Sequence, residues 1–321
     1  MRTLRTLALG LIALAAAATL LGACTPSFQP ADTVVDLRVL GIKADPPEAL
    51  VDGTADANGT LTVTGVEDVT VTALLADPLH DTGTASVLPT VCLPSDGARC
   101  GPSAIDLSSV VGPPPEVSFS LAHQIKGDQL AALQSLLAAA VKDDKLKGLF
   151  GVKVQLMLSV DTQDPAGIQT ALKTLVFSPR RPDGNPNKNH NPTALGLKLI
   201  ELNNHTETGR LAPGETLLLK LGVQVGLRPL LGAGSIEEYD TYDLQGKLVH
   251  LREGLSWSFY TTEGGDLDRS AADEPLAGVG DPPAGLVRFE AARAGQGTLW
   301  AVVRDGRSGT SWTRHPWKAT P

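Results

Sequence analysis

Two stretches of the 321-residue chain gather oxygen-bearing side chains that could bind a hard cation. In RRPDGNPNKNHNP, residues 180–192, Asp or Asn stands at every second position from Asp183 to Asn191, the spacing at which a calcium loop presents its first ligands. Such a loop also needs glycine at its sixth position and glutamate at its twelfth. This chain has Lys188 and Ala194 there. We therefore interpret the stretch as a boundary between two domains, with its asparagines capping turns.

The second stretch is EGGDLDRSAADEP, which begins at Glu263 and adds Asp266 and Asp268 within five residues. Several carboxylates in one flexible loop suit Ca²⁺, and Gly264 and Gly265 would allow the chain to wrap around the ion. The simpler interpretation is a solvated acidic turn, because loops commonly carry charge. Glu263, Asp266 and Asp268 remain candidate metal ligands, and Ca²⁺ is the only cofactor that the sequence leaves open.

The sequence motifs of common enzymes are not found in the chain. It has no H-E-x-x-H, no G-x-S-x-G and no phosphate-binding glycine loop, and its six histidines are scattered singly. We therefore expect no catalysis. Two carboxylates that converge from distant positions leave no signature in a sequence, so a hydrolase stays open as an alternative.

The N-terminus has the pattern of a secretory signal peptide. Arg2 and Arg5 precede an uncharged run that ends at Leu21-Gly22-Ala23-Cys24. This ending resembles a bacterial lipobox, which implies removal of residues 1–23 and acylation of Cys24. Thr25, in place of Asp, implies the outer membrane. Residues 24–31 then form a short polar tether.

Composition narrows the choice of partners. Removal of residues 1–23 would leave 25 basic against 35 acidic residues, and such an acidic chain is not expected to bind nucleic acid. The expected partners are the membrane, through the lipid, and envelope proteins or glycans. Cys92 and Cys100 flank a Pro-Ser-Asp-Gly turn, and in an oxidising compartment this spacing predicts a small-loop disulfide.

The rest of the chain predicts an all-β fold. Alternating stretches such as EDVTVTALLAD and GVKVQLMLSVD indicate half-buried strands, separated by Gly, Pro and Asp turns. One exception, near 128–147, places leucines at helical spacing, with Asp128 as its N-cap and Gly148 as its stop. We expect this helix to pack over the edge of a sandwich.

The layout repeats weakly, which predicts two related domains at 32–180 and 191–321 with a linker at 181–190. Three segments, LRVLGIKADPPEA (37–49), NHNPTALGL (189–197) and LWAVVRDGRSGTSW (299–312), together with the lipobox, resemble uncharacterised myxobacterial-type lipoproteins with immunoglobulin-like domains. The resemblance implies two tandem antiparallel sandwiches, the first with the helical insertion, and brings no catalytic residues.

Two functions from different classes follow. The first is a structural, adhesive or protein-binding lipoprotein of the cell envelope, because sandwiches present loops and sheet edges on a rigid frame. The alternative is a carbohydrate- or substrate-binding accessory protein, or an undetected hydrolase. Because aromatic rings stack on sugars, Trp257, Trp312 and Trp317 are its candidate ligand-stacking residues, and buried tryptophans would favour the structural role.

Overall fold

The computed structural model describes residues 30–55, 61–78, 83–97, 99–144, 151–162, 167–180, 187–242, 245, 247–274 and 285–321. Cys24, the signal peptide and most of the tether lie outside this range, as do residues 181–186 of the linker and Gly148. None of the described helices is long and apolar enough to cross a membrane.

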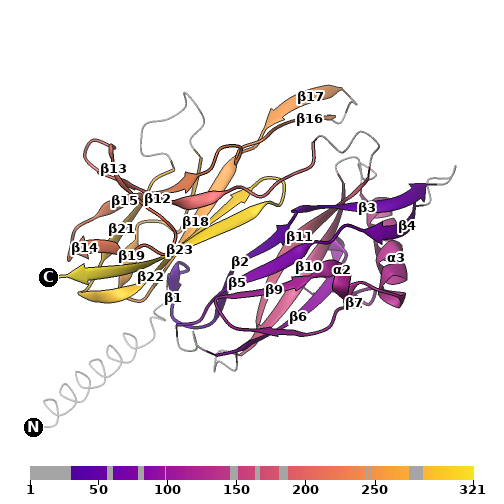
Figure 1. Cartoon of the computed structure of the whole chain (residues 1–321), viewed down its shortest axis with the longest axis horizontal. Helices are drawn as coiled ribbons and strands as arrows, with labels where there is room; N and C mark the ends of the chain where they lie inside the picture. The colour runs from indigo at the N-terminus through magenta and orange to yellow at the C-terminus, as the bar shows by residue number, and fades with distance from the viewer. Residues whose placement is uncertain are drawn as a thin grey trace, which may run out of the picture. The chain divides into compact units, whose positions relative to one another are not determined.

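The first sandwich packs a seven-stranded sheet against a three-stranded one (Figure 1). The larger sheet runs β4 (Leu61–Val66), β3 (Glu48–Ala55), β11 (Gln169–Pro179), β10 (Val152–Asp161), β6 (Ala85–Cys92) and β7 (Ile105–Asp106), with β8 (Val110–Gly112) also on β6. The smaller sheet runs β2 (Arg38–Asp45), β5 (Thr70–Ala76) and β9 (Glu116–Ser120). A single 3-10 turn, η1 (Pro94–Asp96), follows β6.

The predicted helix is present as α3 (Asp128–Asp143), preceded by the short α2 (Leu121–Gln124). Its apolar face is buried as expected, with Leu133, Leu136 and Leu137 in the first core. Two details differ from the prediction. The N-cap is Gly127 rather than Asp128, and the helix contacts β4, β10 and β7 across the seven-stranded sheet. The helix therefore covers the part of the seven-stranded sheet that the smaller, three-stranded sheet leaves uncovered. It does not pack over an edge of the sandwich as predicted.

The second sandwich packs a six-stranded sheet against a five-stranded one. The first of these runs β1 (Thr33–Val34), β18 (Leu255–Thr262), β22 (Gly295–Asp305), β23 (Thr310–Thr320) and β14 (Leu217–Lys220), with β20 (Ala271–Asp273) on β18. The other runs β13 (Glu207–Leu211), β12 (Ala194–Ile200), β15 (Val225–Leu231), β21 (Val287–Ala291) and β19 (Gly265–Leu267). A separate hairpin joins β16 (Glu238–Tyr242) to β17 (Leu248–Arg252).

Both sandwiches share one topological device. Each begins with a strand in its smaller sheet, after which the chain crosses to the larger sheet and runs parallel to the last strand of the domain. In the first sandwich β3 is parallel to β11, and in the second β14 is parallel to β23. The predicted fold of two tandem immunoglobulin-like sandwiches with a helical insertion is thus confirmed.

One element departs from the predicted domain ranges. Thr33–Val34, placed by sequence in the first domain, pairs in parallel with Thr261 and Thr262 of β18 in the second sandwich. Figure 1 shows this strand, β1, lying among the strands of the second sandwich. The first strand after the tether therefore belongs to the six-stranded sheet of the second sandwich, and the chain enters the first sandwich only after it.

Candidate functional site

The two sandwiches are joined by a hydrophobic cluster separate from either core. It is formed by the outer faces of the three-stranded and six-stranded sheets, and its buried members are Val34, Leu40, Leu74, Ala76, Trp300 and Val302. Gly41 lies against it so closely that an added Cβ would meet Val302 Cγ1 at 3.3 Å. This cluster and the polar contacts beside it, centred on Arg307, form what we call the interdomain joint.

The joint explains why two strands are buried on both faces. In β5, Ala73 and Leu75 face the first core while Leu74 and Ala76 face the joint. In β22, Leu299 and Ala301 face the second core while Trp300 faces the joint. These strands had been expected to be half-buried, and they differ because another sheet covers their outer face.

The turn between β22 and β23 carries the polar half of the joint. Asp305 shapes this turn, since its Oδ1 accepts the backbone N–H groups of Arg307 at 2.8 Å and of Gly309 at 2.6 Å. Ser308 adopts a positive φ of 83° within it. The turn therefore holds the Arg307 side chain in a fixed place between the two sandwiches.

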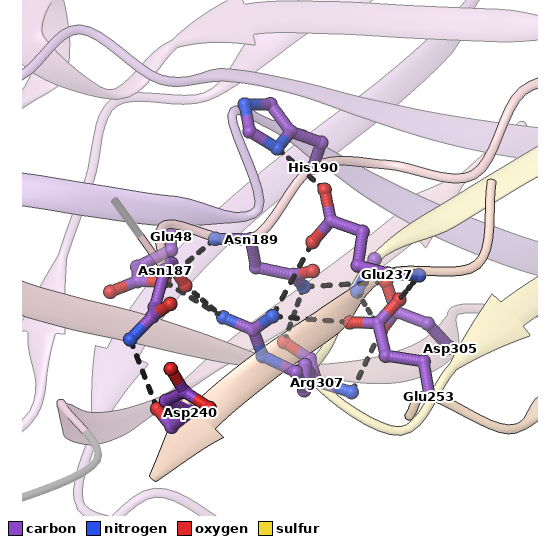
Figure 2. Close-up of polar contacts among 10 residues, drawn as sticks. Glu48, Asn187, Asn189, His190, Glu237, Asp240, Glu253, Asp305 and Arg307 are labelled. Atoms are coloured by element: carbon purple, nitrogen blue, oxygen red, sulfur yellow. Dashed lines mark hydrogen bonds and ion pairs between the residues drawn. The ribbon is translucent and has the colours of Figure 1, made fainter. Parts of the chain in front are cut away.

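Arg307 lies among three carboxylates that come from both sandwiches (Figure 2). Its Nη1 is 3.3 Å from Glu237 Oε2 and 3.3 Å from Glu253 Oε1, and its Nη2 is 3.7 Å from Glu48 Oε2. The guanidinium also stacks on the Tyr239 ring, 4.2 Å from its centroid. Because Glu48 belongs to the first sandwich and the others to the second, this cation links them.

Glu253 is the most deeply buried acid at the joint, with a side chain only 1% exposed. Burial raises its pKa from 4.5 to about 7, helped by the negative charges of Asp305 and Glu237 and opposed by Arg307 and a backbone N–H. That N–H belongs to Glu237 and donates to Glu253 Oε2 at 3.1 Å. Near neutral pH this carboxyl is therefore divided between its neutral and charged forms.

A buried lysine crosses the joint in the opposite direction. Lys173 of β11 donates from its Nζ to Thr310 Oγ1 at 2.9 Å and to the carbonyl of Ser308. Burial lowers its pKa from 10.5 to about 8, with Asp305 opposing the shift. Perturbed groups such as Lys173 and Glu253 often mark active sites, but here both bind the groups that connect the sandwiches.

The Asp/Asn stretch that resembled a calcium loop supplies further contacts at the joint. Asn191 donates from its Nδ2 to the Ala44 carbonyl at 2.8 Å and accepts the Thr310 N–H at 2.8 Å, so one amide ties both sandwiches together. The backbone N–H of Asn189 donates to Glu48 at 2.9 Å, and Lys188 Nζ pairs with Glu67 at 2.8 Å.

These contacts use the side chains that calcium would need. Asn189 is buried and donates from its Nδ2 to the Arg307 carbonyl at 2.9 Å, and Asn187 donates to the Asp240 carbonyl at 3.0 Å. Asn189 and Asn191 therefore bridge the sandwiches rather than cap turns. Asp183 and Asn185, the first two positions of the supposed loop, lie outside the described residues.

The predicted disulfide between Cys92 and Cys100 is present. An open depression lies beside it on the seven-stranded sheet, lined by Thr90, Arg99, Asp106, Met157, Ser159 and Leu172 among others. Asp106 already accepts a hydrogen bond from Thr90 at 2.9 Å.

The candidate metal ligands are not brought together. Glu263 pairs with Arg293 at 3.4 Å, and Asp268 pairs with Arg288 at 3.1 Å. The expected acidic loop in fact contains two short strands, β19 and β20, that join different sheets and separate the carboxylates. Within the described residues, no group of three or more His, Cys, Asp or Glu side chains could hold a metal ion. The structure therefore shows no arrangement of Glu263 and Asp268 that favours calcium over a charged surface turn.

The candidate stacking residues are also mostly withdrawn from solvent. Trp257 is 3% exposed and Trp317 is 1% exposed, both in the second core, because alternation along β18 and β23 turns them inward. Neither ring can stack on a ligand in this structure, which corrects the prediction. Trp312 is partly buried, donates to Glu116 Oε1 at 2.7 Å and lies 5.4 Å from Lys43 Nζ, so it belongs to the joint.

Sequence reasoning missed the joint, although two signals for it were present. The runs ALLA in β5 and LWAVV in β22 break period-two alternation, as strands buried on both faces do. In addition, the three segments that carry the family resemblance meet here, since Ala44 and Glu48, Asn189 and Asn191, and Asp305 and Arg307 each come from one of them.

Comparisons with known proteins give no family. No protein-family model matches the chain, and no curated protein matches it. Membership of the lipoprotein family that the sequence resembles therefore remains a prediction.

Solved structures give only distant likenesses. Red sea bream transglutaminase is 10% identical, with 90% of this chain and 32% of that chain covered and a TM-score of 0.25. The adhesin InvE of Yersinia pseudotuberculosis is 10% identical, with 86% and 58% covered and a TM-score of 0.21. The fibronectin(III)-like modules of Clostridium thermocellum CbhA are 10% identical, with 87% of this chain and 93% of that chain covered and a TM-score of 0.20. The chain spans under two thirds of the first two, and superpositions this loose assign no activity.

Proposed function

We propose that the protein is a lipid-anchored, non-enzymatic module of the cell envelope that presents a rigid pair of sandwiches to a protein partner. The observation that carries this proposal is the interdomain joint. A flexible pair of domains would be connected by a linker alone, whereas here a buried apolar cluster and the Arg307 contacts hold the two sheets face to face. Surfaces on both sandwiches are thereby kept in a constant relative orientation.

Two features support the proposed compartment. The disulfide between Cys92 and Cys100 suits an oxidising compartment outside the cytoplasm, and the lipobox at Cys24 would anchor the chain to the outer membrane. Because β1 follows the tether directly and pairs with β18, the second sandwich would be the one held nearest to the anchor along the chain.

The alternative of a glycan-binding protein loses its main support, since the rings of Trp257 and Trp317 are buried. The hydrolase alternative would use the groups with displaced pKa values. Glu253 and Lys173 are bonded to Arg307, Ser308 and Thr310 at the joint and do not line the depression beside the disulfide. The displaced pKa values of Glu253 and Lys173 are therefore accounted for by their burial in the interdomain joint, without a catalytic role.

Photo-crosslinking in intact cell envelopes tests the proposal. Photoreactive residues at exposed positions on both sandwiches, such as Val111 and Leu218, should give discrete protein adducts, and the Cys24→Ala variant should lose both the adducts and its membrane association. Adducts to glycan alone, or a C24A protein that stays on membranes, would contradict the binding role or the anchor respectively.

A further inference from the structure

The open edge of the six-stranded sheet differs from its counterpart in the first sandwich. In the first sandwich, β4 pairs with the far side of β3 and covers that edge. In the second, β14 is the last strand of its sheet, and its only described partner is β23. The outer N–H and C=O groups of β14 therefore lack a neighbouring strand among the described residues, and such an edge can accept another strand.

Apolar side chains mark this edge. Leu218 is 72% exposed, although Leu217 and Leu219 on either side of it are buried. Leu221 and Val223, which follow β14, are 45% and 49% exposed. Natural edge strands are often protected by charges or prolines, and the one charge of β14, Lys220, stands here next to exposed apolar side chains. The combination of an unpaired edge with exposed leucines is therefore typical of a binding surface rather than of a protected edge.

Three cations lie on the same face of the six-stranded sheet as Leu218. Arg314 and Lys318 project from the exposed face of β23, where they alternate with the buried His315 and Trp317. Lys318 is directly opposite Leu218 in the parallel register, and Lys220 follows two residues later on the same face. We call Leu218, Lys220, Arg314 and Lys318 the β14 surface.

None of these three cations has an ion-pair partner among the residues that the structure describes. Elsewhere on this acidic chain cations are commonly paired, as Arg180 is with Asp52 at 2.7 Å and Arg288 with Asp268 at 3.1 Å. The nearest acid along the chain, Glu215, accepts the N–H of Ala212 in its own turn. The β14 surface is thus a local excess of positive charge on a chain whose formal net charge is −8.

We infer that the β14 surface binds an extended, acidic segment of a partner protein, which adds to the sheet as a strand beside β14. Main-chain hydrogen bonds would supply affinity, and alternate side chains would supply specificity. An acidic residue of the segment would lie beside Lys220 and face Lys318 across β14, and an apolar residue would lie beside Leu218. This inference rests on the proposed protein-binding role and names the chemistry of the partner.

The probe is a short fluorescent peptide in which two Glu and two Val alternate, so that each face of the strand carries both, with a Lys/Val peptide of the same pattern as its counterpart. We expect the fluorescence anisotropy of the Glu/Val peptide to rise when the full chain is added, and that of the Lys/Val peptide not to. The double variant K220E/K318E should weaken the Glu/Val peptide by about tenfold or more and should gain binding of the Lys/Val peptide. Binding that is indifferent to this charge exchange would overturn the inference.

Matched controls lie on the seven-stranded sheet. Lys153 is exposed on β10 and Leu172 is 44% exposed on β11, so Lys153→Glu and Leu172→Thr make similar chemical changes away from β14. We expect these variants to bind the Glu/Val peptide as the wild type does, and Leu218→Thr to bind it more weakly. Equal losses in both sets would show non-specific attraction and would contradict the inference.

Two further measurements separate the possible failures. Vesicles of phosphatidylglycerol that bind through Lys220 and Lys318, while the Glu/Val peptide does not, would replace the protein partner with a lipid surface. If photo-crosslinks in the envelope form at Val111 but not at Leu218, the β14 surface is wrong and the protein-binding role survives. If they form at neither position, the proposed function itself fails.

Discussion

The two sandwiches share a topology but close their cores in different ways. The first is mostly aliphatic, although it includes Phe119 and Phe177, and α3 supplements its three-stranded sheet with leucines that reach the core. The second has no helix among its described residues and fills its interior with large rings, including Phe289 and Trp317 packed edge to face at 6.0 Å. The same topological device therefore tolerates two packing solutions, because a core requires volume filled at high density rather than a particular residue type.

The sandwiches also differ in whether their edge strands are covered, but each contributes one sheet face to the interdomain joint. The parallel strand of the first, β3, is covered by β4, while β14 of the second is open. Both contribute an outer sheet face to the joint, where carboxylates from each surround Arg307. A sheet face that would be solvated in a single domain is thus buried in the joint of this pair. The sheet edge that stays open at β14 is available to a partner.

The largest expected effects test the two core solutions. Leu137→Ala removes a buried side chain of α3 and should cost about 2 to 5 kcal/mol of unfolding free energy, while Phe289→Ala should cost about 3 to 5 kcal/mol. Urea unfolding measures both. A cost below about 1 kcal/mol for Leu137→Ala would mean that α3 is an appendage and that the first core closes without it.

The next effect concerns the joint. Arg307→Met should leave Glu48, Glu237 and Glu253 without their cation and cost about 3 kcal/mol, and calorimetry should then resolve separate unfolding of the two sandwiches. Arg293→Met is the matched control, because its pair with Glu263 is solvent-exposed, and it should change stability by less than about 0.5 kcal/mol. A single transition of unchanged midpoint in Arg307→Met would contradict the joint's role.

A pH dependence of about 3 kcal/mol on each side of neutrality should follow from the same site. The pKa of Glu253 is raised from 4.5 to about 7, so the stability held by its proton is fully present below pH 4.5 and is lost as the pH rises through 7. The pKa of Lys173 is lowered from 10.5 to about 8, so the folded state gains stability as the pH rises from 8 to 10.5. Stability should therefore pass through a minimum between about pH 7 and 8.

Urea titrations across this range, repeated on Glu253→Gln, measure that profile. The variant keeps the shape of the side chain and removes its titration, so the acid-side slope should flatten while the alkaline slope from Lys173 remains. An unchanged acid-side slope in Glu253→Gln would assign the dependence to another group.

The smallest effect on stability is expected at the open edge. Leu218→Thr replaces an exposed leucine with a good strand former and should change the unfolding free energy by less than about 0.5 kcal/mol. The buried neighbour provides the contrast, since Leu217→Thr should cost about 1 to 3 kcal/mol by burying a hydroxyl. Thermal unfolding compares them, and similar losses would show that Leu218 supports the fold rather than faces a partner.

Local patterns predicted much of this protein. Alternation assigned Val71 and Val154 to a core face, helical spacing assigned Leu133 and Leu137, and a short turn predicted the disulfide of Cys92 with Cys100. Each of these inferences depends on residues close in sequence, where the backbone period alone decides which side chains share a face. The predicted turn-capping role of Asn189 and Asn191 was wrong for the same reason, because their partners lie far along the chain.

The tertiary structure alone decided what the outer faces and polar side chains do. Whether Leu74 and Trp300 meet solvent or another sheet, whether Arg307 has three carboxylates beside it, and whether β14 has a neighbour all depend on contacts between residues far apart in the sequence. Even Glu253, the nearest in sequence of the three carboxylates, is 54 positions from Arg307. A period of two fixes which residues share a face of a strand. The same period carries no information about which element covers that face. In this protein the joint and the open edge of β14 therefore depend on how the sheets pack and pair.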